Sequence, residues 1–199
     1  RWQQRGDEPC HVTAVWDRHS MALNVHSLQQ KVDLFDALVS PILNYCCDVW
    51  GPEILGRGVG LQSMLNNPVH QVQFMFLRCV AGGVRKSTPR HLLLREFACK
   101  PLMRTWIKCA CDLWNRAVAS GTNGLLYQCL SENWEMRSDM RYGIKVWSQQ
   151  FAALLSRIGC SPPSGGQTAS ETTALGRLDT TTIMTPFGDW FMQDLHDQP

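Results

Sequence analysis

Cysteine and histidine are the first side chains whose chemistry must be considered, because the chain holds nine of one and six of the other. Structural zinc sites need paired ligands at short loop spacing. The candidate ligands are Cys10-His11, Cys46-Cys47 and Cys109-Ala110-Cys111. They are adjacent in the sequence or share a predicted helix, where neighbouring residues point to different faces. We therefore expect cysteines that pack as small apolar side chains, and no metal site.

Residues that could perform catalysis lack the surroundings that such residues need. The sequence has no G-x-S-x-G elbow, and the glycines at positions 56, 58 and 60 lack the lysine and the strand–helix setting of a phosphate-binding loop. Two-metal nucleotidyl transfer requires clustered carboxylates. The sequence contains no adjacent Asp-Asp pair, and Asp7-Glu8 is its only adjacent acidic pair. We therefore predict that the chain is not an enzyme and has no catalytic residue and no cofactor.

Basic side chains gather in the middle of the chain. Residues 57–116 contain ten lysines and arginines against Glu96 and Asp112, a net charge of +8, whereas residues 170–199 contain five acids against one arginine, a net charge of −4. This asymmetry favours a polyanionic partner for the middle of the chain. A solvated surface of uneven charge would have the same composition, so composition leaves both interpretations open.

Two places in this basic stretch have the geometry of a phosphate contact. Residues 85–88 (Arg-Lys-Ser-Thr) lie before a predicted helix with Thr88 as its N-cap, which places cations, hydroxyls and free backbone N–H groups together. On a later predicted helix, Arg104 and Lys108 are four residues apart and share a face. The predicted nucleic-acid-binding residues are Arg78, Arg85, Lys86, Ser87, Thr88, Arg90, Arg104 and Lys108. A plain N-cap with solvated neighbours is the alternative.

Apolar residues at helical spacing predict an all-α fold that holds these residues. We expect an irregular helical domain of about six helices over residues 12–159, and a linker with an acidic tail over 160–199 that carries one short helix near 189–195. Helix boundaries are set by a capping box at Ser27, prolines at 41, 68, 89 and 101, a stop at Gly51-Pro52, and glycines at 82–83, 121 and 159. Pro41 should kink or split its helix. The predicted core comprises Phe35, Leu38, Ile42, Trp50, Phe76, Leu77, Trp106, Leu113 and Trp147.

The compartment can also be approached from the sequence. No apolar run is long enough to span a bilayer and no signal-peptide pattern opens the chain, so we expect no membrane partner. An odd number of cysteines in a chain of 199 residues is typical of free thiols in a reducing, intracellular setting. The chain begins at Arg1, which favours a fragment or a processed product.

Three short blocks of residues then occur in order between about residues 20 and 120. They are LFDALVSPILNY at 34–45 with DVWG at 48–51, F-x-F-L-R at 74–78 with GVRKSTP at 83–89, and Arg95-Glu96 with KPL at 100–102 and Trp106. In this order and spacing they resemble the region downstream of the polymerase core in LINE-type (non-LTR) retrotransposon reverse transcriptases. The resemblance implies a helical thumb that packs on a palm domain and holds an RNA or RNA–DNA duplex, in the nucleus or the cytoplasm.

The chain also departs from that family. The catalytic aspartate motif of the palm and the C-terminal cysteine/histidine knuckle are absent, and residues 161–199 match nothing in the family. Two functions therefore remain open. The first is a nucleic-acid-contacting thumb separated from a reverse transcriptase palm. The second is a structural interaction protein derived from such an element and docked by its helices in a larger assembly, such as a ribonucleoprotein complex.

Overall fold

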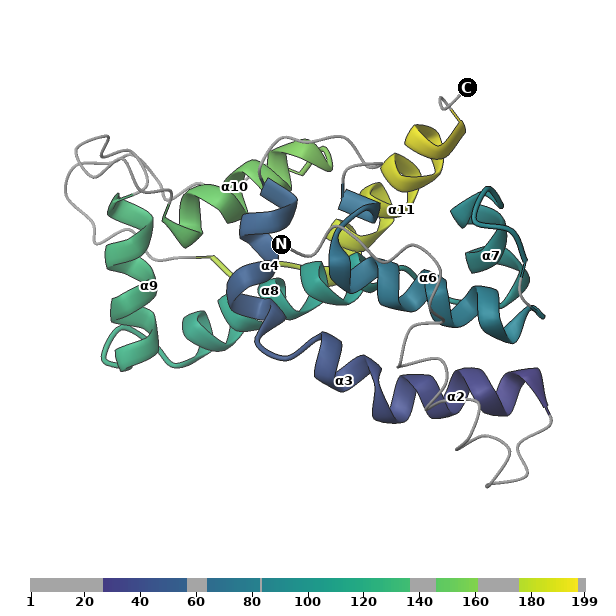
Figure 1. The fold of residues 1–199 in the computed structure, drawn as a ribbon. Helices are drawn as coiled ribbons and strands as arrows, with labels where there is room; N and C mark the ends of the chain where they lie inside the picture. The colour runs from purple at the N-terminus through teal and green to yellow at the C-terminus, as the bar shows by residue number, and fades with distance from the viewer. Residues whose placement is uncertain (1–26, 57–63, 83, 137–145, 161–175, 197–199) are drawn as a thin grey trace, which may run out of the picture. The chain divides into compact units, whose positions relative to one another are not determined.

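The computed structural model describes residues 27–56, 64–82, 84–136, 146–160 and 176–196 (Figure 1). These residues form helices and turns and contain no strand, which confirms the all-α prediction. The chain divides into two compact units. Unit 1 holds the described part of Arg1–Tyr45 together with Asn66–Lys100, and unit 2 holds the described parts of Cys46–Leu65 and Pro101–Pro199.

Unit 1 is built from α2 (Leu28–Leu38), α3 (Ser40–Leu43), α6 (Pro68–Val80) and α7 (Arg90–Glu96). The predicted split at Pro41 is confirmed, since α2 ends before it and Pro41 lies in the first turn of α3, where a missing N–H is harmless. The capping box at Ser27 is wrong. Ser27 occupies the N-cap position, but its side chain makes no capping hydrogen bond.

The helices α6 and α7 begin in different ways. The side-chain oxygen of Asn67 accepts the Val69 N–H at 2.9 Å and caps α6, which starts at Pro68 as predicted. The prediction that Thr88 caps a helix starting at Pro89 is wrong, because Pro89 itself is the N-cap, with an extended ψ of 134°. The Thr88 N–H instead closes a turn onto the Arg85 carbonyl at 3.0 Å.

Unit 2 is organised around α8 (Leu102–Ala119), whose inner face is almost completely buried. The other helices of unit 2 are α4 (Cys47–Gly56), α9 (Leu125–Glu135), α10 (Trp147–Arg157) and α11 (Thr180–His196). Helix α4 packs against both α8 and α10. Two glycines permit this approach: a Cβ on Gly51 would lie 3.1 Å from the Trp106 Cβ, and one on Gly56 would lie 2.6 Å from the Gln150 carbonyl oxygen.

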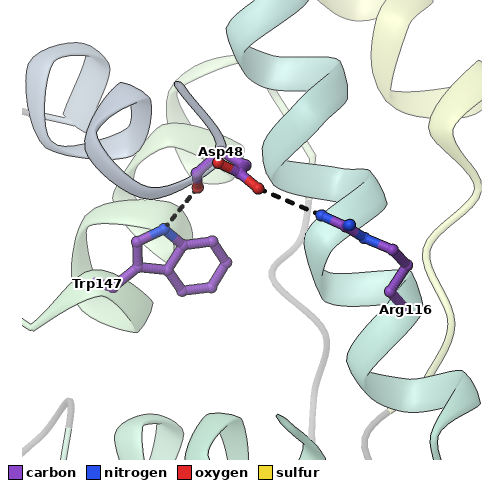
Figure 2. A network of polar contacts seen from close by, with 3 residues as sticks. All are labelled: Asp48, Arg116 and Trp147. Carbon is purple, nitrogen blue, oxygen red and sulfur yellow. Dashed lines mark hydrogen bonds and ion pairs between the residues drawn. The ribbon is translucent and has the colours of Figure 1, made fainter. Parts of the chain in front are cut away.

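The predicted stop at Gly51-Pro52 is wrong, because α4 continues through both residues to Gly56. A proline inside a helix leaves the carbonyl four residues earlier without its N–H donor. Here that carbonyl belongs to Asp48, and it accepts the indole N–H of Trp147 from α10 at 3.0 Å (Figure 2). The Asp48 carboxylate also pairs with Arg116 of α8 at 3.2 Å. A side chain 99 residues away thus supplies the donor that Pro52 lacks.

The described part of the C-terminal segment, residues 176–196, belongs to unit 2. Trp114 of α8 donates its indole N–H to the Gly176 carbonyl at 2.8 Å, and the Asn115 amide bonds both the N–H and the carbonyl of Leu178. Asp179 then accepts the Thr181 N–H at 2.9 Å as α11 begins. The helix is 17 residues long, more than the short helix expected. The predicted linker at 161–166 lies outside the described residues.

The predicted core is correct in part. Phe35, Phe76, Leu77 and Trp106 are buried, and Phe35 stacks on Phe76 with ring centroids 4.2 Å apart. Trp50, Leu113 and Trp147 are half-buried. Leu38 and Ile42 are exposed, at 57% and 74%. Leu38 is the last residue of α2, and Ile42 lies beyond the break in α3, which has no buried residue. No described helix is both long enough and apolar enough to cross a membrane.

Candidate nucleic-acid interface

The structure divides the predicted binding residues between the two units. Arg78, Arg85, Lys86, Ser87, Thr88 and Arg90 lie in unit 1, whereas Arg104 and Lys108 lie on α8 in unit 2. The charges divide in the same way. The described residues of Asn66–Lys100 carry six lysines and arginines against one acid, Glu96, whereas those of unit 2 carry five against eight. The excess of positive charge therefore belongs to unit 1.

The loop between α6 and α7 presents its side chains to solvent. Arg85, Lys86 and Ser87 are exposed, as expected of a phosphate contact. Arg78, in the last turn of α6, holds the loop: its Nη2 donates to the Lys86 carbonyl at 3.3 Å. Thr88 does not cap α7, and it is half-buried along an apolar groove. The loop thus offers two cations and one exposed hydroxyl, and the predicted contribution of Thr88 as an N-cap is wrong.

Arg78 and Arg90 are half-buried and close to one another. Arg90 donates from Nη2 to the Asn66 side-chain oxygen at 2.7 Å, and its guanidinium carbon lies 5.5 Å from the centre of the Phe74 ring, a cation–π contact. Phe74 lies one helical turn before Arg78, so the two share a face of α6. Burial lowers the pKa of both guanidinium groups, and the charge of Arg78 lowers that of Arg90 further.

His70 continues the same face of α6 one turn before Phe74 and was not predicted. It is completely buried. Burial, and then the charge of Arg90, lowers its pKa to about 4. The imidazole is therefore neutral near pH 7 and adds no charge to the two arginines. His70 lies eight residues before Arg78 on α6, a spacing that the sequence shows. Arg90 comes near His70 only because α7 packs against α6.

The remaining predicted residues, Arg104 and Lys108, lie on α8. Lys108 is exposed and Arg104 is half-buried. Their spacing of four residues gives them a common helix face, as predicted. They form a second, smaller basic patch on a unit whose described residues are acidic overall.

Comparison with protein-family models, with curated proteins and with solved structures finds no match. The blocks that resemble reverse transcriptases lie at helix junctions. The first spans α2, α3 and α4, the second spans α6 and the exposed loop, and the third runs from the end of α7 into α8. The resemblance therefore remains a prediction from these residues.

The cysteines and acids of the described residues do not form a metal-binding group of three or more ligands. Eight cysteines are described, and none of these eight is in a disulfide bond. Cys47 and Cys111 are buried, and burial raises the pKa of each thiol to about 12. These two behave as the packed apolar side chains that we expected, whereas Cys46 and Cys129 are exposed.

Unit 1 also contains an apolar groove of about 500 Å³ between α2, the end of α6, and α7. Val32 and Leu93 form buried parts of its wall. Leu28 and Leu92 also line it, and they are 55% and 40% exposed. An apolar groove with exposed leucines is typical of a surface that contacts another protein.

Proposed function

We propose that this chain is a non-catalytic helical module that grips the phosphates of RNA or an RNA–DNA duplex, as the thumb of a reverse transcriptase would. The observation that carries the proposal is the charge of Asn66–Lys100, where six basic residues oppose one acid in the described part. Arg85 and Lys86 extend from an exposed loop, and the Arg78 side chain holds that loop by a hydrogen bond to the Lys86 carbonyl. Phosphate contacts need cations of this kind, without base recognition.

This mode of binding has a measurable signature. Each phosphate that a lysine or arginine neutralises releases counterions, so the affinity falls with salt, with a log–log slope of about −0.9 per phosphate for duplex DNA and somewhat less for single strands. Since the contacts carry little sequence information, the affinity should be similar for unrelated sequences.

The experiment is a salt titration of binding to a fluorescently labelled RNA–DNA duplex. We expect Arg85→Ala/Lys86→Ala to flatten the slope by about one to two units and to leave the helical content unchanged. Arg104→Ala/Lys108→Ala removes the same charge from unit 2 and is the matched control, with a smaller expected effect. Equal slopes for the wild type and the first double variant would contradict the proposal.

The alternative function is that of a structural interaction protein. The apolar groove of unit 1, with Leu28 and Leu92 exposed, is the observation that favours it. The two functions predict different results in the same titration. A chain that binds neither RNA nor the duplex at low salt would favour protein docking, and substitution of Leu28 and Leu92 by serine would then be the next step.

A further inference from the structure

Arg78 and Arg90 are held differently from the other cations of unit 1. Arg85 and Lys86 extend into solvent. In contrast, Arg78 is tied to the Lys86 carbonyl, and Arg90 is tied to Asn66 and lies over the Phe74 ring. Every one of these partners is electrically neutral. The contacts orient the two guanidinium groups without cancelling their charge.

The two arginines also have donors that are not used. Arg78 Nε and Arg90 Nη1 are shielded from solvent and have no hydrogen-bond acceptor among the described residues. Among the described residues, no carboxylate forms an ion pair with Arg78 or Arg90. Buried donors without acceptors destabilise a protein, and so do two like charges held together in a partly dry setting. An anion bound by both guanidinium groups would relieve the repulsion between their charges.

We propose that Arg78 and Arg90 form a binding site for one dianionic phosphate, namely the terminal phosphomonoester of a nucleic-acid strand. The inference rests on the proposed function, because a nucleic acid supplies the phosphate. Two uncompensated positive charges match a phosphomonoester, which carries a charge of about −1.5 to −2 near pH 7, better than a backbone diester with one charge. The planar guanidinium presents paired N–H donors that suit two phosphate oxygens.

The surroundings explain how the site is kept open and which way it faces. The Phe74 ring supports Arg90, so that the guanidinium does not collapse onto the helix. The loop that carries Arg85 and Lys86 is bonded to Arg78, and it places two exposed cations where the strand leaves the terminal phosphate.

The test compares two single-stranded RNAs of the same sequence, one with a 5′-phosphate and one with a 5′-hydroxyl, at fixed salt. The wild type should bind the phosphorylated strand about tenfold more tightly, which is the factor expected for hydrogen bonds to a charged group. Arg90→Lys keeps the charge but loses the paired donors, so this preference should fall to about twofold or less. Arg95→Lys makes the same change at an exposed position of α7 and should retain the preference.

The outcomes separate this inference from the proposed function. If both strands bind equally, with the expected dependence on salt, the terminal-phosphate site is refuted and the proposed function stands. If neither strand binds at low salt, both are refuted. Inorganic phosphate provides the second measurement: a rise in melting temperature that Arg90→Lys abolishes supports the site. If free phosphate stabilises the chain while the two strands bind equally, the ligand is free phosphate and the strand-end inference is overturned.

Discussion

Trp147→Phe tests whether an indole of α10 replaces a backbone donor that α4 lacks. Pro52 has no N–H, and in an uninterrupted helix that N–H would bond to the carbonyl of Asp48. The Trp147 indole occupies this role at 3.0 Å (Figure 2). Phenylalanine keeps a ring against Phe151, which stacks on Trp147 with centroids 4.8 Å apart, but it cannot donate a hydrogen bond.

The expected loss in free energy of unfolding is about 1–3 kcal/mol, the range for a buried acceptor that loses its donor. The Asp48 carbonyl is in a part-buried contact, so water reaches it in part and the lower half of the range applies, about 1–2 kcal/mol. The smaller ring adds less to this loss than it would at a fully buried position, because Trp147 is half-buried.

A double-mutant cycle with Pro52→Ala separates the hydrogen bond from the change in ring size. Pro52→Ala restores an N–H that can bond to Asp48, so Trp147→Phe should destabilise that background by about 1 kcal/mol less than it destabilises the wild type. The assay is urea unfolding followed by circular dichroism. Trp114→Phe is the control, since Trp114 donates to the unrelated Gly176 carbonyl and its effect should add to that of Pro52→Ala. Equal losses from Trp147→Phe in both backgrounds would refute the reasoning.

Three further predictions concern stability. Trp106→Ala should destabilise unit 2 by about 3–5 kcal/mol, because the ring is completely buried, and a loss below about 1 kcal/mol in urea unfolding would contradict its place in the core. Gly51→Val should destabilise by about 1–3 kcal/mol, since even a Cβ would lie 3.1 Å from Trp106, and an unchanged melting temperature would argue against this close packing. The pKa of His70 is lowered from 6.5 to about 4, so the unfolded chain binds the extra proton first. Stability should therefore fall as the pH drops from 6.5 towards 4, and His70→Gln should flatten that dependence in unfolding experiments at a series of pH values.

Helix starts were predictable where the signal is local. Pro68 and Pro101 precede or open helices as expected, because a fixed φ and a missing N–H suit the first turn. The prediction that Pro52 stops the helix was wrong because the Trp147 indole, far along the chain, replaces the N–H donor that Pro52 lacks. Local sequence rules cannot include a donor whose position depends on how two helices pack.

In the candidate site, too, local features were predictable from the sequence and features that depend on helix packing were not. The exposure of Arg85 and Lys86 follows from their place in a polar turn, and the sequence predicts it. The pairing of Arg78 with Arg90 depends on α7 packing across one face of α6, which no spacing along the chain encodes. The exposed Ile42 has a related cause, since a stripe at helical spacing predicts a buried face only while the helix is continuous, and α2 ends at Leu38.

The order of segments along the chain also affects synthesis on the ribosome. Helix α4 is made before α8 and α10, against which it packs, and the Arg157 side chain that bonds the Leu55 carbonyl is made 102 residues later. At roughly 5–20 residues per second, α4 is translated about 5–20 s before that partner exists. Until α8 is made, part-way through this interval, the buried face of α4, which includes Cys47, Pro52 and Leu55, has neither of its partner helices to cover it. The nascent chain should therefore depend on chaperones over this stretch of translation.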